Sequence, residues 1–339
     1  MLEDNLIEKN KGKDARQSVI SLTTHGQALL QELRPHWDAT FAATKMLESE
    51  IQAPLMDLLE RSVEALGERS FADRIQDSKA HLSSGAGANR ERNPFQSGGD
   101  RYSEFRPSYP AELAESLAAL TSESNVAIDV GCGNGQLTSL LAPYFREVVG
   151  IDPSESQLKH AQAAKNVTYH ARTAEDTGLP DDSADLITVA QAAHWFDLEK
   201  FYAEARRIAR NEAAIALVSY GVPYISGTVN AVFQQGYWQE VHEFWSPERF
   251  HVETAYANLF FPFPLIQVSS HNCRAEMSVD QFINYITTWS AYAKACAQGQ
   301  QDRFDNFFEM LSKAWQGEAV KQVVWPVSVK AGRIQKSAE

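Results

Sequence analysis

Three closely spaced glycines and one acidic residue carry the strongest chemical signal in the sequence. Gly131, Gly133 and Gly135 follow a short apolar run, residues 126–130, which predicts a buried strand entering a glycine-rich turn. A helix-like segment and a second apolar run come next, and that run ends in Asp152, 21 positions after Gly131. A βαβ unit of this kind offers backbone N–H groups to a ligand, and its carboxylate can accept both hydroxyls of a ribose. The pattern therefore predicts a site for a nucleoside-containing cofactor.

The glycine spacing discriminates between cofactors. The third glycine stands two positions after the second, whereas the dinucleotide fingerprint requires it three positions after, where this chain has Gln136. The spacing therefore counts against NAD or FAD. The alternative is a tight strand–helix turn that binds no ligand.

Composition sets the broad class. At 339 residues two domains are expected, and 31 basic against 44 acidic residues give a net charge of −13, which disfavours general nucleic-acid binding. The three cysteines are far apart and form no metal-ligand spacing, so we expect no metal and a reducing, cytoplasmic location. No apolar run is long enough to span a membrane.

The motif Asp129-Val-Gly-Cys-Gly-Asn-Gly135 and the ending Gly150-Ile-Asp152 resemble those of the class I S-adenosylmethionine-dependent methyltransferases. The likeness extends over about residues 101–334. His194-Trp-Phe-Asp197 and the segment 288–290 are similar to the type 11 and trans-aconitate-like members. The resemblance implies a Rossmann-like α/β fold, with a seven-stranded, mostly parallel sheet and an antiparallel C-terminal hairpin. It also implies S-adenosylmethionine as cofactor and a small molecule as methyl acceptor, with a carboxylate as one candidate.

The resemblance also assigns cofactor contacts. They are Tyr102, Arg106, Asp129, Gly131, Gly133, Gly135, Asp152, Ala174, Glu175 and Gln191. Arg106 would pair with the cofactor carboxylate as a fork donor, or is a surface arginine. Ala174 and Glu175 would meet the adenine, although Thr173 stands where many members have Asp; the alternative is an exposed acidic turn.

Residues that leave the fourth strand are candidates for the acceptor side. His194 is either a general base, because its unperturbed pKa is near 6.5, or a structural histidine bonded to the backbone. Trp195, Tyr220 and Trp238 are expected to line the substrate pocket. The aromatic-rich insertion 222–265 would form a lid over it, or a small core under a long loop. Arg172, Arg249 and His251 are the cationic partners available to a carboxylate acceptor.

The elements that position these residues follow from periodicity and turn signals. Helices are predicted at 136–141, 155–164, 198–209, 279–297 and 303–315, and strands at 126–130, 148–151, 167–171, 185–190, 214–220, 265–274 and 322–330. Arg210–Ala213 is predicted as a turn that replaces the Pro-Gly-Gly common in the family.

Residues 1–82 form a separate predicted domain. Two β-like runs, 6–8 and 18–22, predict a hairpin, and Thr23 or Thr24 would cap the long helices that follow. This part, with Asp14 and Arg16, resembles the wing and dimerisation helices of a MarR-type regulator. The recognition helix is missing, so we expect a homodimer contact rather than DNA binding. A misplaced start at Met1 is the alternative.

We place a linker at residues 83–100 and the methyltransferase-like domain at 101–339. The competing function is a MarR-derived regulator or binding module that only senses S-adenosylmethionine. An NAD-linked oxidoreductase is disfavoured by the glycine spacing and by the late antiparallel strands.

Overall fold

The computed structural model describes residues 6–11, 18–31, 33–34, 44, 63, 106–315 and 320–336. The chain divides into two compact units, Met1–Ala80 and His81–Glu339. The predicted linker, Tyr102 and most of the predicted N-terminal helices lie outside the described residues. In the described part, no helix is long and apolar enough to cross a membrane.

The N-terminal unit contains the predicted hairpin. Strands β1 (Ile7–Lys11) and β2 (Ser18–Leu22) pair antiparallel, with Ile7 opposite Leu22. A helix runs over residues 24–31. Thr23 caps it, because its Oγ1 accepts a hydrogen bond of 3.0 Å from the backbone N–H of Gly26. The hairpin is therefore confirmed, whereas the MarR-type resemblance stays a prediction.

The second unit is an α/β domain with an added group of helices. Its strands are β3 (Val126–Val130), β4 (Glu147–Ile151), β5 (Val167–His170), β6 (Ala184–Ala190), β7 (Ala209–Tyr220), β8 (Tyr224–Ile225), β9 (Leu265–Ile266), β10 (His271–Met277) and β11 (Lys321–Ile334). Its α-helices are α5 (Ala111–Ala118), α6 (Gln136–Leu141), α7 (Glu155–Leu158), α8 (Leu198–Ile208), α9 (Val229–Gly236), α10 (Arg249–Glu253), α11 (Val279–Thr287), α12 (Ser290–Ala297) and α13 (Gln301–Ala314). Short 3-10 or π turns are η2 (Ala142–Tyr144), η3 (Ala193–Trp195), η4 (Tyr237–Val241) and η5 (His242–Phe244).

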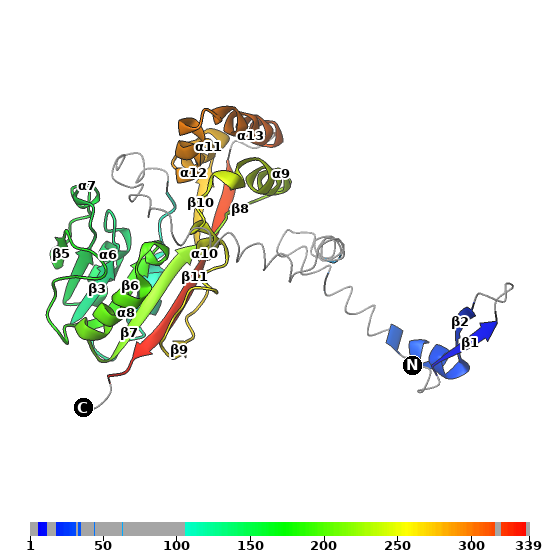
Figure 1. Ribbon diagram of the computed structural model, residues 1–339, viewed down its shortest axis with the longest axis horizontal. Helices are drawn as coiled ribbons and strands as arrows, with labels where there is room; N and C mark the ends of the chain where they lie inside the picture. Colours follow the sequence, from blue (N-terminus) through cyan, green and yellow to red (C-terminus); the bar gives the residue numbers. More distant parts are fainter. Residues whose placement is uncertain are drawn as a thin grey trace. The chain divides into compact units, whose positions relative to one another are not determined.

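The sheet has the topology implied by the resemblance. The strand order is β10-β11-β7-β6-β3-β4-β5; neighbours among β3 to β7 are parallel, and β11 is antiparallel to both β7 and β10 (Figure 1). The short strands β8 and β9 also pair with β11. β4 and β6 lie on opposite sides of β3, so the strand order reverses there, and ligands bind outside the carboxyl ends at such a point. That edge carries the glycine loop and the residues after β4, β6 and β7.

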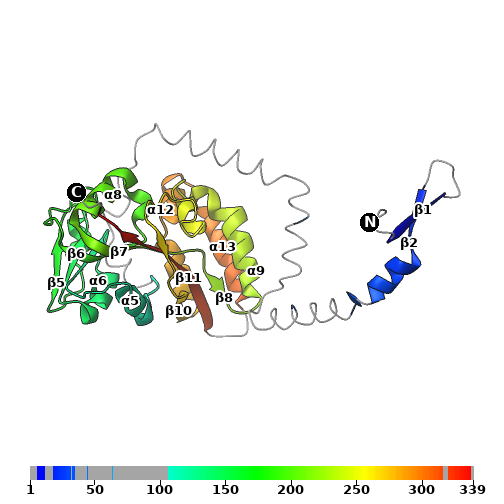
Figure 2. The ribbon, with the colours of Figure 1, turned by 90° about the horizontal axis from the view of Figure 1, so that it is seen from below.

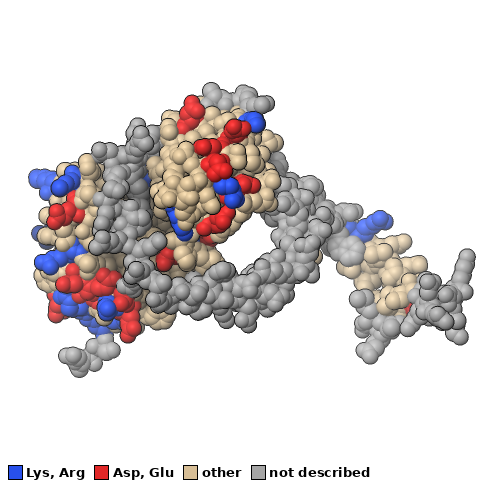
Figure 3. All heavy atoms as spheres, turned by 45° about the horizontal axis from the view of Figure 1, so that its top comes forward, with Lys and Arg blue, Asp and Glu red and all other residues tan. Residues whose placement is uncertain are grey.

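Strand β11 ties the sheet to a helical cap, which we define as α9, α11, α12 and α13. One half of β11 pairs with β7 and the other half with β10 and β8, and the cap helices gather at the β10 and β8 end (Figure 1). Figures 1 and 2 both place α9 beside α13. On the cap surface acidic and basic side chains are interspersed (Figure 3), as in the Arg303 pairs with Glu240 and Glu243.

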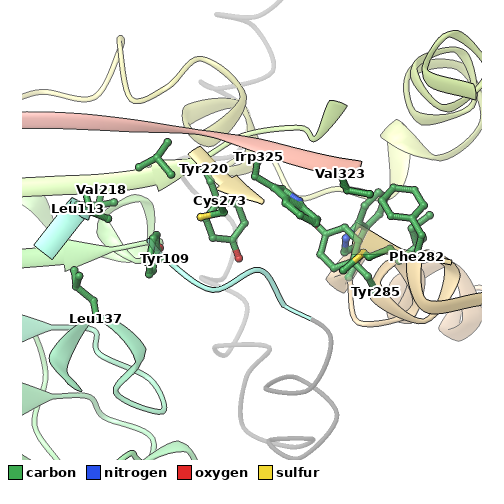
Figure 4. Packing of buried hydrophobic residues seen from close by; sticks show 14 of the residues in the cluster. Tyr109, Leu113, Leu137, Val218, Tyr220, Cys273, Phe282, Tyr285, Val323 and Trp325 are labelled. Carbon is green, nitrogen blue, oxygen red and sulfur yellow. The ribbon is translucent and has the colours of Figure 1, made fainter. Parts of the chain in front are cut away.

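The core runs without interruption from the sheet into the cap. One cluster joins α5 and the inner face of β7 to the aromatic rings of the cap, and Figure 4 shows Leu113 and Val218 at one end and Phe282 and Trp325 at the other. A second cluster lies under α8, on the opposite face of the sheet, and includes Phe201, Tyr256 and Phe263. The insertion 222–265 therefore contributes to both cores and is no loose loop.

Several predicted elements differ from those found. The helix predicted at 155–164 ends at Leu158, because Gln162 turns back to the glycine-loop region: its N–H donates to the Asn134 carbonyl (3.0 Å) and its Oε1 accepts from Ser139 Oγ (2.6 Å). The predicted turn at Arg210–Ala213 is wrong, since these residues continue β7 through a register shift, with Glu212 at φ 62°.

Two other predictions are wrong near the cap. The helix predicted at 279–297 is two helices, because the extended backbone of Trp289 (ψ 141°) separates α11 from α12 and places its indole among the aromatic rings of the cap. The strand predicted at 265–274 is the short β9 followed, after a break, by β10.

Candidate active site

The glycine loop between β3 and α6 adopts a conformation that favours glycine at all three positions. Gly131, Gly133 and Gly135 have φ of 70°, 55° and 78°. An added Cβ would come within 2.5 Å of the Ala192 Cβ at Gly131, and within 2.1 Å of the Tyr169 hydroxyl oxygen at Gly135. At Gly133 the nearest atom would be 4.0 Å away. The loop is therefore tightly packed on two sides and leaves space for a ligand at Gly133.

Asp152 sits at the end of β4, directly against this loop. Its Oδ2 accepts a hydrogen bond from the Gly133 N–H (2.9 Å), and its Oδ1 accepts one from the Ser154 N–H (2.8 Å). Burial raises the pKa of this carboxyl above its usual 3.8, although the two N–H donors oppose the shift. Each oxygen keeps a second lone pair, which suits the hydroxyls of a ribose.

Asp129, at the end of β3, is the second buried carboxyl of the site. Thr138 Oγ1 donates to its Oδ2 (2.7 Å) and Thr188 Oγ1 donates to its Oδ1 (2.8 Å), so the residue ties β3 to α6 and β6. Burial raises its pKa to about 6; the two threonine hydroxyls oppose that shift and the charge of Asp152 adds to it. The side chain therefore orders the elements that carry the glycine loop.

Together Asp129 and Asp152 make the loop region electronegative and poorly solvated. Each carboxylate is more costly to ionise than in water, so the site gains stability when a cation enters it. A pyrophosphate would bring like charge next to both carboxylates. These two carboxylates therefore suit a cationic nucleoside better than a dinucleotide.

The loop after β5 carries the predicted adenine contacts. Ala174 is buried, and Glu175 Oε1 accepts a hydrogen bond of 2.9 Å from the Asp197 N–H at the start of α8. Glu204 on α8 anchors the same loop, because its Oε1 accepts from both the N–H (2.9 Å) and the hydroxyl (2.5 Å) of Thr177. Loop 174–177 is thus held rigidly against α8.

Replacing Glu204 with Gln tests this anchor. Burial opposes ionisation, but hydrogen bonds from Arg207 and Thr177 lower the pKa of Glu204 from 4.5 to about 2. Because the folded-state pKa is depressed, the stabilisation is present above pH 4.5 and is lost as the pH falls toward 2. We expect E204Q to lose about 2 kcal/mol of unfolding free energy at pH 7 and progressively less below pH 4.5.

Urea unfolding at pH 7 and at pH 3 provides the measurement. The control is E199Q, since Glu199 is an exposed residue in the first turn of the same helix. Equal stability losses for E204Q and E199Q would show that Glu204 does not anchor the loop.

Gln191 links the ends of β6 and β7. Its backbone has φ 55°, its N–H donates to the Val218 carbonyl (2.8 Å), and its Nε2 donates to the Tyr220 carbonyl (3.1 Å). Its Oε1 is buried and has no hydrogen-bond partner among the described residues. A buried acceptor without a partner is costly, so this oxygen suits a ligand that donates a hydrogen bond.

His194 lies in the turn η3 and shares a hydrogen bond of 2.9 Å between its Nδ1 and the Tyr256 hydroxyl. Its pKa is lowered to about 3, chiefly by burial, and the charges of Arg249 and His251 contribute to this shift. The imidazole is therefore neutral near pH 7 and is a weak base. This environment favours a positioning role over proton abstraction, and the general-base role stays a prediction.

Tyr256 was not singled out as a site residue by the sequence. It follows α10, and both it and Ala255 have left-handed backbones, with φ of 58° and 55°. Such conformations cost free energy in residues other than glycine and persist only where the surroundings enforce them. Lys330 on β11 supports this segment by donating to the Tyr256 and Leu259 carbonyls, at 3.1 and 2.8 Å. In the sequence, nothing distinguishes Tyr256 from the other aromatic residues of the insertion 222–265.

Replacing Tyr256 with Phe is expected to cost about 1–2 kcal/mol of unfolding free energy, because the imidazole of His194 loses its hydrogen-bond partner. Urea unfolding at pH 7 measures the loss. The control is Y224F, which changes a tyrosine that is more than half exposed and should leave stability within about 0.5 kcal/mol. If the two variants lose the same amount, the bond to His194 does not contribute.

The remaining predicted residues fall in different places. Trp195 packs beside His194, with ring centroids 4.9 Å apart, and Tyr220 packs against Tyr109 at 5.9 Å, close to the β7 end (Figure 4). Arg106 donates from Nη2 to the Thr288 carbonyl (3.3 Å). It thereby joins the segment before α5 to the cap, and its contact with the cofactor stays a prediction.

Trp238 lies in η4, and its side chain is half-exposed. Its indole Nε1 donates to Gln234 and its ring packs on Tyr237 and His242, so its described contacts stay within its own helical segment. Its place in the substrate pocket stays a prediction.

The three cationic residues predicted as partners of a carboxylate acceptor do not all lie in the same place. Arg249 and His251, on α10, lie close enough to His194 to depress its pKa. Arg172 instead lies beside Gly178 in the loop after β5. The structure thus gathers Arg249, His251 and Tyr256 around His194, in the turn that follows β6.

Comparison with known proteins defines the class. The family description of a methyltransferase domain matches residues 128–217, which hold the glycine loop, Asp152 and strands β3 to β7. A Dictyostelium discoideum protein described, without a named substrate, as a methyltransferase is 36% identical over 218 residues. These residues cover 63% of this chain and 83% of that protein. The chain therefore belongs to this methyltransferase family and has the enzymatic class of its members.

Two further comparisons agree. The solved structure of a type II methyltransferase from Anaeromyxobacter dehalogenans is similar, with a TM-score of 0.64 and 39% identity, over 69% of this chain and 100% of that one. A Saccharomyces cerevisiae protein described as a probable S-adenosylmethionine-dependent methyltransferase is 31% identical over 131 residues, 36% of this chain and 45% of that protein. The fold of the second unit is accordingly the Rossmann-like methyltransferase fold.

Proposed function

We propose that the chain transfers the methyl group of S-adenosylmethionine to a small-molecule acceptor. The observation that carries the cofactor assignment is the pair of buried carboxyls, Asp129 and Asp152, whose pKa values are both raised at an open glycine loop. S-adenosylmethionine has a sulfonium and an ammonium group, so its binding would offset the cost of ionising these carboxyls. The description of the yeast relative as S-adenosylmethionine-dependent supports the same cofactor.

The residues present fit the parts of this cofactor. Asp152 has two free lone pairs for the ribose hydroxyls, and the open face at Gly133 allows close approach to the backbone. The unpartnered Oε1 of Gln191 can accept from an ammonium group, and the rigid loop at Ala174 and Glu175 would hold the adenine. NAD fits less well, because its pyrophosphate would meet two carboxylates.

The chain's own contribution to the reaction is alignment and exclusion of water. When bound, S-adenosylmethionine supplies an already activated methyl group, so little acid–base chemistry is required of the protein. The residues after β6 and β7 hold one side of the site, since Gln191 joins the two strand ends. Neutral His194, fixed by Tyr256, presents a polar but uncharged surface to the acceptor. Holding the reactants in one geometry can supply much of the rate enhancement.

Thermal unfolding with and without ligands tests the cofactor assignment. At about 100 times its dissociation constant a ligand adds roughly 2.7 kcal/mol of stability, which corresponds to a shift of several degrees. We expect S-adenosylmethionine and its demethylated product to raise the unfolding midpoint and NAD to leave it unchanged. A shift with NAD alone, or with none of the three, would contradict the proposal.

A further inference from the structure

Arg249 is a nearly buried arginine whose outer end is open. Its side chain is 14% exposed, and its guanidinium stacks over the Trp245 ring at 4.3 Å. Among the described residues, its polar neighbours lie at the inner nitrogen, Nε, which donates to the Tyr237 hydroxyl (3.4 Å) and lies 3.6 Å from Glu253 Oε1. Within the described chain, the two terminal amino groups have no hydrogen-bond partner.

Glu253 holds this arginine in one orientation. Its Oε1 accepts from the Tyr237 hydroxyl at 2.5 Å, and its Oε2 lies 3.1 Å from His242 Nε2. Because the Glu253 oxygens are engaged by Tyr237, by His242 and by the Nε of Arg249, Glu253 fixes the guanidinium without bonding to the fork formed by its two terminal amino groups. That fork is the edge that binds a planar oxyanion through two parallel hydrogen bonds.

The Trp245 ring, on which Arg249 stacks, carries a buried indole N–H that makes no hydrogen bond to any described residue. The Nδ1 of His251, two residues further along α10, is also buried and makes no hydrogen bond to the described part of the chain. An indole N–H can only donate, and burying it unsatisfied is costly. The accessible guanidinium fork of Arg249 and the buried indole N–H of Trp245 together offer donors to a single acceptor group.

Aromatic rings lie around this donor set. Trp289 packs 5.3 Å from the Trp245 ring and 5.6 Å from the Tyr285 ring, measured between ring centroids. His194, whose pKa the Arg249 charge depresses, connects the group to the cofactor side of the site. A ligand held by the arginine would therefore place its body among flat apolar surfaces beside His194.

We propose that Arg249, with the indole N–H of Trp245, binds a carboxylate of the methyl acceptor, and that the body of this acceptor is flat and apolar. The inference rests on the proposed function and specifies the substrate class of that site. A carboxylate matches the planar fork and carries one negative charge, whereas a phosphate dianion would place two charges near Glu253. Arg249 binds and orients the acceptor in this proposal, which does not depend on which atom of the acceptor is methylated.

The test compares two probes that differ in charge but hardly in shape. Binding of phenylacetate and of phenylacetamide to the full chain is measured by ligand-detected NMR, with and without S-adenosylhomocysteine. We expect phenylacetate to bind wild type at least tenfold more tightly than phenylacetamide. R249Q should lose this preference, R249K should keep only part of it, and W245F should reduce it about threefold. R303Q, which changes the partly exposed arginine paired with Glu240 and Glu243, should keep it fully.

Equal binding of both probes to wild type, no binding of phenylacetate, or an unchanged preference in R249Q would each overturn the proposal. Circular dichroism verifies that R249Q folds. If R249Q is unfolded, the preference for phenylacetate measured on wild type and on W245F tests the proposal. Binding of S-adenosylhomocysteine is measured on the same samples. If S-adenosylhomocysteine does not bind, the result counts against the proposed cofactor. If it binds but phenylacetate is not preferred over phenylacetamide, the result counts against the carboxylate anchor alone.

Discussion

Replacing Asp152 with Asn is expected to weaken S-adenosylmethionine binding by roughly 100-fold. Two charge-assisted hydrogen bonds to ribose hydroxyls are each worth about 1.5 kcal/mol, and their loss amounts to about 3 kcal/mol. The substitution also removes one of the two negative charges that favour a cationic ligand at the loop. Asparagine keeps an acceptor for only one of the N–H groups of Gly133 and Ser154, so loop order also decreases.

The matched control is D176N, because Asp176 is an exposed carboxylate in the neighbouring loop after β5. It should bind S-adenosylmethionine within about twofold of wild type. Calorimetric titration of wild type, D152N and D176N makes the comparison, and unfolding midpoints verify that each protein is folded. If D152N and D176N bind equally well, Asp152 is not the ribose ligand and the cofactor lies elsewhere.

Asp129→Asn is expected to stabilise the protein while weakening cofactor binding. Burial raises the pKa of Asp129 from 3.8 to about 6, so its ionised form costs the folded state up to about 3 kcal/mol. Because the folded-state pKa is raised, stability is lost as the pH rises from about 4 through 6. An amide avoids that cost and can still bond to the hydroxyls of Thr138 and Thr188, one as donor and one as acceptor.

We therefore expect D129N to gain about 1–3 kcal/mol of unfolding free energy at pH 8 and almost nothing at pH 4. Urea unfolding across this range measures the gain. The control is D185N, another buried aspartate, which accepts from the N–H groups of Asn125 and Val126 and pairs with Arg210. That variant should lose stability, since it breaks an ion pair. A D129N protein that is less stable than wild type at pH 8 would contradict the account of this carboxyl.

The glycine loop and its flanking elements could be predicted because their signal is local. Strand β3 and helix α6 begin and end where the sequence predicted, and β4 differs by one residue. A glycine is needed where the backbone is left-handed, and a short apolar run between polar residues predicts a parallel strand. The mostly parallel sheet and its late antiparallel strands were predicted from the resemblance.

The acceptor side could not be predicted because it depends on contacts between distant segments. Tyr256 reaches His194 only through left-handed residues that Lys330, 74 positions later, helps to hold. Arg249 is fixed by Tyr237 and Glu253 within an insertion that contributes to two cores. Even the early end of helix α7 goes with contacts between separate segments, since Gln162 bonds to Asn134 through its backbone and to Ser139 through its side chain. No periodicity in the sequence signals these pairings.

Calorimetric titration of the wild-type chain with S-adenosylmethionine and with NAD, at pH 6 and pH 8, distinguishes a methyltransferase site from a dinucleotide site. We expect micromolar binding of S-adenosylmethionine and none of NAD. A cation lowers the raised pKa of Asp129, so binding at pH 6 should release up to about half a proton, and at pH 8 almost none. Binding of NAD, or no binding of S-adenosylmethionine at either pH, would contradict the claim that the two buried carboxyls form a site for a cationic cofactor.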